Sequence, residues 1–254
     1  MRILLTNDDG ILAPGILAAR QALSQIGDVF LVAPERQRSA AGHAITLHKP
    51  LRMSEITLPD GAVGCATNGT PADCVSLGLE IVMEGRCDLV VSGINSGSNL
   101  GWDLTYSGTV AAAFEGAVLH TPSIAISVAA DGVPTTQIDY TAAARFVVKL
   151  ARQLEADPLA ANTFLNVNVP AVAEKDIAGV SVTHQGRREY YDRIEARTDP
   201  SGREYYWQGG SIRIDEPDPG SDVDAILQKK ISVTPIHLDL TAYPLLQQLR
   251  KWNF

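Results

Sequence analysis

The chain has 254 residues, 45% of them hydrophobic, and a formal net charge of -8 at pH 7. This hydrophobic content supports a substantial buried core and excludes the disordered and fibrous classes. The acidic balance argues against a general binder of nucleic-acid polymers or of membrane surfaces.

The cysteines and the apolar runs narrow the class of protein further. Cys65, Cys74 and Cys87 are odd in number and lack CxxC spacing, so they indicate neither a disulfide framework nor a zinc site. We interpret them as small buried hydrophobes in a reducing cytoplasm. No apolar run reaches the ~18 residues of a membrane-spanning helix. Because the first predicted strand starts at Met1, we expect no signal peptide and a cytoplasmic location.

The amino terminus is a short apolar run that predicts a buried strand, and it ends in two adjacent carboxylates, Asp8 and Asp9. In an open parallel sheet, ligands bind beyond the carboxyl ends of the strands. Adjacent carboxylates repel unless something positive lies between them, and a hard divalent cation is the simplest candidate. A solvated turn explains the same Asn-Asp-Asp-Gly segment, so its residues alone leave both interpretations open.

A helix over residues 14–26 and a buried strand over 28–34 complete a unit of the size of a right-handed βαβ crossover. The polar loop that follows, residues 35–46, is expected at the same sheet edge as the two carboxylates. It carries four side chains that could hold or cover an anion: Arg36, Arg38, Ser39 and His43. A surface loop is the competing interpretation, and we interpret His43 as incidental. The role of Ser39 stays open at this point because a hydroxyl is a weak metal ligand.

Two short strands are predicted within residues 47–66, around a Pro-Asp-Gly turn. A helix should start directly after them. Thr70 is a good N-cap, Pro71 suits the first helical position, and Asp73 favours the positive helix end. The helix is expected to run to Gly85, and structural capping explains this motif without any chemistry.

A third buried strand, residues 88–95, leads into a glycine-rich loop and then a helix of small residues over 110–119. The glycines let backbone amides approach a ligand without side chains in the way. Ser107, Gly108 and Thr109 lie where this helix begins, so its free N–H groups and positive dipole end describe a phosphate cradle. The loop is neither a Walker A loop nor a G-x-G-x-x-G fingerprint.

The alternation continues with a strand over 123–128, a helix over 139–155 and a strand over 164–169. Alternating helices and near-continuous apolar strands predict a Rossmann-like, doubly wound, mostly parallel α/β sheet with three layers. We assign residues 1–185 to this Rossmann-like α/β domain.

After Pro170 the near-continuous apolar strands give way to segments that alternate as exposed strands. We assign residues 186–254 to an oligomerisation region. It contains a short helix at 221–227 and three further predicted elements: a hairpin at about 188–210, a strand at about 230–236 and a terminal helix at about 241–254. An isolated hairpin is marginal in water, and the apolar face of the terminal helix needs a partner. We therefore expect both to pack on another subunit. A hairpin folded back on its own domain is the competing arrangement.

Five blocks of sequence then occur together in one order: residues 7–11, 33–42, 68–75, 92–101 and 106–112. Any one of them is a weak signal, but the set resembles the SurE family of stationary-phase survival proteins, which are metal-dependent nucleoside monophosphate phosphatases. The resemblance is tight over about residues 1–185 and looser in the tail.

The resemblance implies one divalent metal ion per subunit, Mg²⁺ or Mn²⁺. The implied metal ligands are Asp8, Asp9, Ser39 and Asn95. The implied phosphate-binding residues are Ser107, Gly108, Thr109 and Ser39. The implied substrate is a nucleoside 5′- or 3′-monophosphate, with short polyphosphate as a further candidate. The family exchanges its hairpin and terminal helix between subunits, which implies a homodimer or homotetramer.

The expected mechanism has Asp8, Asp9 and Asn95 as the catalytic residues. The metal would polarise a phosphoryl oxygen and lower the pKa of a bound water. Either aspartate can serve as general base or as covalent nucleophile, and the sequence does not choose between them. A haloacid-dehalogenase-type phosphatase would carry Asp-x-Asp instead of adjacent aspartates. A nucleotide-sugar-dependent transferase and a non-catalytic nucleotide-binding sensor on the same fold also compete with the phosphatase.

Overall fold

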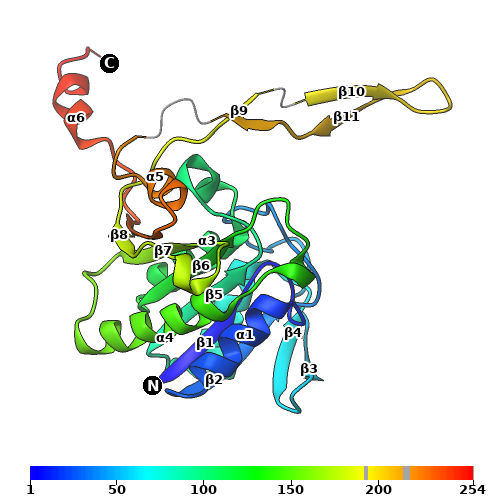
Figure 1. Ribbon diagram of the computed structural model, residues 1–254, viewed down its shortest axis with the longest axis vertical. Coiled ribbons are helices and arrows are strands. Elements are labelled where there is room, and N and C mark those ends of the chain that lie inside the picture. Colours follow the sequence, from blue (N-terminus) through cyan, green and yellow to red (C-terminus); the bar gives the residue numbers. More distant parts are fainter. Residues whose placement is uncertain (192–193, 214–217, 254) are drawn as a thin grey trace.

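The computed structural model describes residues 1–191, 194–213 and 218–253, and a mixed sheet runs through the centre of this part of the chain (Figure 1). The strands of this sheet are β1 (Arg2–Thr6), β2 (Asp28–Pro34), β3 (Met53–Thr57), β4 (Val63–Thr67), β5 (Leu89–Asn95), β6 (Ser123–Ala129), β7 (Thr163–Pro170), β8 (Val180–Val182) and β13 (Ile231–His237). Their order is β3-β4-β2-β1-β5-β6-β7-β13-β8. Only β3 against β4 and β13 against β7 are antiparallel, so the predicted mostly parallel α/β sheet is confirmed.

Helices cover both faces of the sheet and complete the three predicted layers. The α-helices are α1 (Pro14–Leu23), α2 (Pro71–Leu77), α3 (Gly108–Val118), α4 (Thr141–Ala156), α5 (Asp222–Leu227) and α6 (Tyr243–Leu249). Short 3₁₀ turns are η2 (Gly101–Thr105), η3 (Thr135–Gln137) and η4 (Glu174–Asp176). α1 packs beside α4, and α2 packs beside α3. Successive side chains of β1 point to opposite faces of the sheet, so this strand contributes to the hydrophobic core on each face. Ile3 and Leu5 face α1 and α4, whereas Leu4 faces α2.

The helix after Thr70 starts as predicted, but it changes from an α-helix to a π-helix before its predicted end. Thr70 Oγ1 accepts a hydrogen bond from Asp73 N, and the Asp73 carboxylate accepts one from Thr70 N, which closes a capping box. After α2 the chain forms a π-helical segment, η1 (Gly78–Val82), instead of the α-helix expected up to Gly85. A Cβ on the first residue of η1 would lie 2.5 Å from Leu4, so close packing on the sheet requires glycine there.

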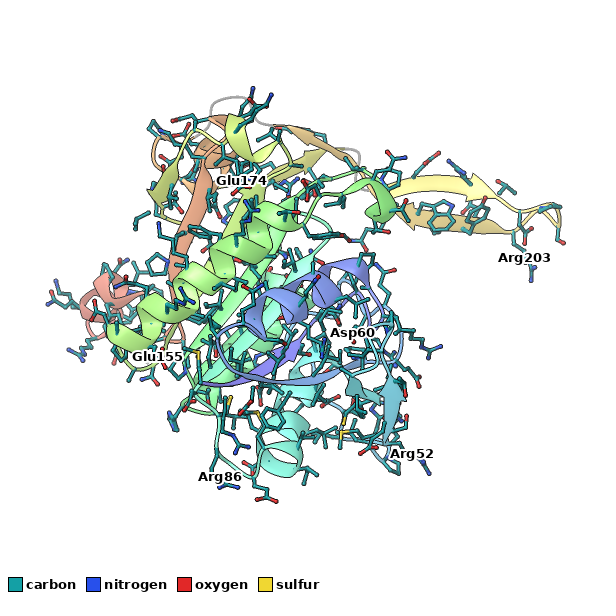
Figure 2. The ribbon with its side chains drawn as sticks, turned by 60° about the horizontal axis from the view of Figure 1, so that its bottom comes forward. Arg52, Asp60, Arg86, Glu155, Glu174 and Arg203 are labelled. Atoms are coloured by element: carbon teal, nitrogen blue, oxygen red, sulfur yellow. The ribbon has the colours of Figure 1, made fainter. Side chains whose placement is uncertain are left out.

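The C-terminal third carries an extended arm, which we define as β9 (Glu189–Tyr191), β10 (Ile194–Thr198), β11 (Glu204–Gln208) and β12 (Ser211–Arg213). β10 and β11 form the predicted antiparallel hairpin, and its turn places Arg203 at the far tip (Figure 2). The pairing of β9 with β12 was not expected from the sequence, because residues 211–213 are too short to show alternation. The arm projects away from the sheet, and its exchange between subunits stays a prediction (Figure 1).

The predicted strand near 230–236 is β13, and it lies inside the main sheet between β7 and β8. The division of the chain at residue 185 stays a prediction. α6 closes the chain apart from the sheet core, with Leu245 and Tyr243 exposed (Figure 1). In the part of the chain that the structure describes, none of the helices combines the length and apolarity needed to cross a membrane.

Candidate functional site

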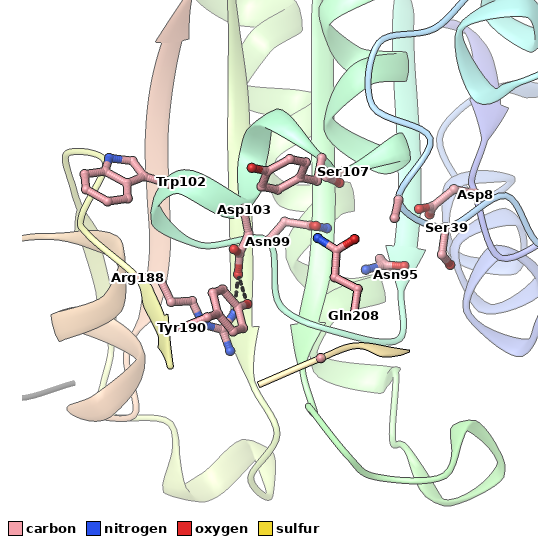
Figure 3. A pocket seen from close by; sticks show the side chains of 13 residues that line it. Asp8, Ser39, Asn95, Asn99, Trp102, Asp103, Ser107, Arg188, Tyr190 and Gln208 are labelled. Carbon is pink, nitrogen blue, oxygen red and sulfur yellow. Dashed lines mark hydrogen bonds and ion pairs between the residues drawn. The ribbon is translucent and has the colours of Figure 1, made fainter. Parts of the chain in front are cut away.

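A cavity of about 720 Å³ lies at the carboxyl ends of β1 and β5 (Figure 3). One end of it, which we call the inner half, is lined by Asp8, Ser39, Asn95 and Ser107. The opposite end, the outer half, is lined by Trp102, Asp103, Arg188 and Tyr190. The other lining residues are Ala40, Asn99, Tyr106, Gln208 and Gly209. The inner half therefore unites residues from four separate blocks of the sequence, as the topology of a parallel sheet predicts.

Asp8 is a buried carboxylate at the centre of the inner half, only 4% exposed. Its Oδ1 accepts a 2.5 Å hydrogen bond from the Thr109 hydroxyl, and its backbone oxygen accepts one of 2.7 Å from Arg38 N. Burial raises the pKa of Asp8 to about 6; repulsion from Asp9 adds to the rise, and the Thr109 hydrogen bond opposes it. A carboxylate in this position gains most from a nearby cation.

Asp9 lies beside this carboxylate, and its Oδ2 accepts a 3.1 Å hydrogen bond from Ser96 N in the loop after β5. The turn that presents both aspartates is held by Asn7, which bonds to Gly10 through both of its amide atoms at 2.9 and 3.2 Å. The Asn-Asp-Asp-Gly segment is therefore a turn, and that turn aims two carboxylates at one sheet edge. Asp9 is half-buried and is not among the residues that line the cavity.

Asn95 ends β5, where the register with β6 shifts between Ser92 and Asn95. Such irregularities re-aim side chains beside functional sites. Its Nδ2 donates a 2.8 Å hydrogen bond to the Gly97 carbonyl, so the amide oxygen is the atom left to face a ligand. Figure 3 shows Asn95 facing the cavity between Ser39 and Asn99.

The loop after Asn95 is held in place by buried asparagine side chains of β7, which the sequence did not lead us to expect. Asn166 Nδ2 and Asn168 Nδ2 both donate to the Asn99 carbonyl at 2.9 Å, and Asn168 Oδ1 accepts from Asn99 N at 2.8 Å. Asn99 Nδ2 also donates to Ser127 Oγ at 2.7 Å. The signal was present in the sequence, because two asparagines alternate within an otherwise apolar buried strand, β7.

Ser39 is exposed at the cavity, and its hydroxyl accepts a 2.8 Å hydrogen bond from Gln37 Nε2. Its loop is tethered to α3 by His43, whose Nε2 lies 2.7 Å from Glu115 Oε2 and whose ring packs on Phe114 at 4.8 Å between centroids. The His43 contact lowers the pKa of Glu115 more than burial raises it. His43 thus has a structural role that the sequence did not reveal.

The first turn of α3 rests directly on Asp8. Ser107 caps the helix by accepting a 3.1 Å hydrogen bond from Val110 N, and it lines the cavity. A Cβ at Gly108 would lie 2.8 Å from Asp8 Cβ, so glycine is required for this approach. Thr109 donates to Asp8 through its hydroxyl, and a backbone hydrogen bond from Thr109 also lowers the pKa of this carboxylate. The first N–H groups of a helix have no acceptor inside it, and they form an anion site.

The outer half is built around Arg188, a buried cation that sequence reasoning missed. Its guanidinium donates to Ser98 Oγ at 2.6 Å, to Asp103 Oδ2 at 3.0 Å and to Asp131 Oδ2 at 2.8 Å. Tyr190 donates to the same Asp103 oxygen at 2.6 Å. Burial raises the pKa of Asp131, but the bonds from Ser98 and Arg188 outweigh it and leave the pKa below its ordinary value. The root of the arm is thereby fastened to the cavity wall.

The predicted metal ligands offer only oxygen atoms: two carboxylates, the Ser39 hydroxyl and the Asn95 amide oxygen. Oxygen donors with two negative charges suit Mg²⁺ or Mn²⁺. Within residues 1–191, 194–213 and 218–253, no group of three or more His, Cys, Asp or Glu side chains is placed to hold a metal ion. The buried charge of Asp8 is the observation that makes these residues fit a divalent cation.

Comparison with known proteins agrees with this geometry. A profile of the family described as Survival protein SurE matches residues 3–192. The 5′-nucleotidase SurE of Geobacter sulfurreducens is 48% identical over 253 residues, covering 100% of this chain and 94% of the relative. That of Symbiobacterium thermophilum is 49% identical over 254 residues, covering 99% and 98%. The crystal structure of the SurE protein from Aquifex aeolicus superposes with a TM-score of 0.85 at 40% identity and covers 98% of both chains. The chain belongs to the SurE family of survival proteins.

Proposed function

We propose that this chain is a divalent-metal-dependent 5′-nucleotidase that hydrolyses nucleoside monophosphates to nucleoside and phosphate. The observation that carries the proposal is the contact between Asp8 and the first turn of α3, which places a buried carboxylate beside an anion-binding helix end. The cavity of about 720 Å³ has room for a whole nucleotide. The names of the relatives support the same activity, and nucleoside 3′-monophosphates and short polyphosphate stay further candidate substrates.

Asp8, Asp9, Ser39 and Asn95 would hold the metal in this scheme. When bound, a divalent ion supplies Lewis-acid polarisation of a phosphoryl oxygen and acidifies water. Both Mg²⁺ and Mn²⁺ suit these oxygen ligands. The Thr109 hydroxyl keeps Asp8 in one orientation, and Asn7 keeps the turn that presents Asp9.

The chain's own residues then bind the phosphate and move one proton. The N–H group of Gly108, at the start of α3, binds a phosphoryl oxygen and stabilises the charge that this oxygen gains in the transition state. Thr109 completes this phosphate-binding turn and orients Asp8. Asp8 or Asp9 accepts a proton from the attacking water, whose oxygen forms the new bond to phosphorus. The bond from phosphorus to the ribose oxygen breaks, and a proton returns to that oxygen, so nucleoside and phosphate leave with all atoms balanced.

The assembly that we propose is a homodimer or homotetramer in which the arm and α6 pack on another subunit. The support is apolar exposure, since the side chains of Tyr206 and Trp207 on β11 and of Leu245 on α6 are 60%, 58% and 51% exposed. Light scattering coupled to size-exclusion chromatography measures the subunit number. A strictly monomeric protein at micromolar concentration would contradict this assembly.

The activity is tested by phosphate release from a panel of nucleoside monophosphates, with Mg²⁺ or Mn²⁺ added back separately after chelation. We expect metal-dependent release from 5′-monophosphates and loss of release in Asp8→Asn. Turnover of nucleotide sugars with little action on monophosphates would favour a transferase, and binding without release would favour a sensor. Membership of the SurE family disfavours both the transferase and the sensor.

A further inference from the structure

The two halves of the cavity differ in charge, and this difference limits what each can bind. The inner half has the anion-binding end of α3 together with the carboxylates of the metal site. In the outer half, the single cation of Arg188 faces two carboxylates, Asp103 and Asp131. Among the described residues that line the cavity, no positive charge is left over there for a second phosphate. The outer half therefore suits the uncharged end of a substrate.

The outer half also offers the surfaces that a flat, hydroxylated molecule uses. Trp102 and Tyr106 line the cavity and are 47% and 64% exposed, so both aromatic residues are accessible at its wall. Aromatic faces bind planar heterocycles by stacking. A nucleoside combines such a heterocycle with ribose hydroxyls, and it is the part of a nucleoside monophosphate that carries no charge.

Gln208 lies between the two halves, at the end of β11. Figure 3 shows its side chain directed into the cavity that Asn95 and Asn99 also line. It is exposed and lines the cavity together with Gly209. A carboxamide both donates and accepts hydrogen bonds, so it matches ribose hydroxyls and the polar edges of a base.

The position of Gln208 is set by the root of the arm. β11 is paired with β10 at Gln208 and Ile194, and the chain continues at once into β12, which pairs with β9 at Ser211 and Tyr191. β9 is in turn held at the cavity by the Tyr190 hydroxyl, which donates to Asp103. The arm therefore brings Gln208 to the cavity from a segment more than a hundred residues beyond the metal site.

We propose that Gln208 is a substrate-contacting specificity residue, whose carboxamide hydrogen-bonds the nucleoside part of the substrate. The arm thus contacts the group attached to the phosphate, whereas the inner half binds the phosphate itself. This inference rests on the proposed nucleotidase activity. p-Nitrophenyl phosphate is a phosphomonoester without ribose and base, so it lacks the nucleoside groups that Gln208 is proposed to contact.

The test compares Gln208→Ala with the wild type on a nucleoside 5′-monophosphate and on p-nitrophenyl phosphate. Loss of one neutral hydrogen bond should raise KM for the nucleotide roughly three- to ten-fold. Both constants for p-nitrophenyl phosphate should stay unchanged. Gln25→Ala removes the same carboxamide from an exposed site outside the cavity and serves as the matched control, with unchanged kinetics on both substrates.

Product inhibition gives a second readout that does not depend on nucleotide turnover. With p-nitrophenyl phosphate as substrate, the inhibition constant of the free nucleoside should rise in Gln208→Ala, whereas that of inorganic phosphate should not. Equal changes on both substrates, or no change in the nucleotide KM, overturn the role of Gln208. A wild-type enzyme that releases phosphate from p-nitrophenyl phosphate but from no nucleotide instead refutes the proposed function.

Discussion

The Thr109 hydroxyl donates a 2.5 Å hydrogen bond to Asp8 Oδ1, which ties the first turn of α3 to the end of β1. The other carboxylate oxygen, Oδ2, lies toward Gly108, 3.0 Å from where a Cβ of that residue would be. One oxygen of Asp8 is thus used for orientation, and the other faces the helix end. The proposed metal ligand and the proposed phosphate-binding turn are therefore in direct contact.

Thr109→Val should lower kcat for nucleotides by roughly ten-fold, because Asp8 loses the donor that orients it and its buried Oδ1 loses its partner. The unpaired oxygen should also lower the free energy of unfolding by about 1–3 kcal/mol. Steady-state kinetics and urea denaturation measure the two effects. Thr109→Ser keeps the hydroxyl and should retain most activity. Wild-type kinetics in the valine variant would show that the hydrogen bond does not matter.

Asp8→Asn should abolish metal-dependent phosphate release and yet stabilise the metal-free protein above pH 6. Burial raises the pKa of Asp8 from 3.8 to about 6, so the folded state binds more protons than the unfolded state between these values. Stability of the metal-free wild type therefore falls as pH rises through this window. The neutral amide removes that cost and still accepts from Thr109. The measurement is the melting temperature of both proteins at pH 5 and pH 8 in the presence of chelator. If the excess melting temperature of Asp8→Asn over the wild type does not grow with pH, the prediction is wrong.

Metal affinity should weaken as the pH falls through about 6, because a proton and the cation compete for the Asp8 carboxylate. Isothermal titration with Mn²⁺ between pH 5 and pH 8 measures this dependence together with the proton released on binding. The Asp8→Asn variant should bind far more weakly at every pH, without this slope. Affinity that is independent of pH in the wild type would place the cation elsewhere.

Arg188→Met should destabilise the protein, at the lower end of the roughly 3–5 kcal/mol seen when one partner of a buried ion pair is removed. The lower end applies because Asp131 is 46% exposed and water screens it. The KM for nucleotides should rise as the root of the arm loosens. Arg187→Met, at the exposed neighbouring position, is the matched control. Equal stability of the two variants in urea denaturation would mean that the outer half does not depend on Arg188.

Much of the fold follows from local sequence patterns. Apolar runs and turn residues locate the strands, and the N-caps Thr70 and Ser107 mark their helices because capping is a contact between residues three apart. The inner half of the cavity is also predictable, since parallel strands bring the residues after their carboxyl ends to one edge. Asp8 and Asn95 line the same cavity for this reason, although the chain between them is long.

Other contacts depend on the paths that loops take between distant segments. Thr109 reaches Asp8 across 101 positions, and Arg188 reaches Ser98 across 90. Neither partner is marked by spacing, because threonine and arginine are common at exposed sites as well. His43 shows the same limit, since its partner Glu115 lies 72 residues away on α3.

The sequence by itself therefore determined the layers of the fold, the sheet edge at which the candidate site lies and the chemical types present there, because these depend on periodicity and on strand direction. Only the tertiary structure decided which oxygen of Asp8 accepts the Thr109 hydrogen bond and which residues Arg188 joins in the outer half. It also decided that the arm brings Gln208 to the cavity. Those features depend on packing between segments far apart in the chain, where burial and hydrogen-bond geometry select one partner among many that the sequence allows.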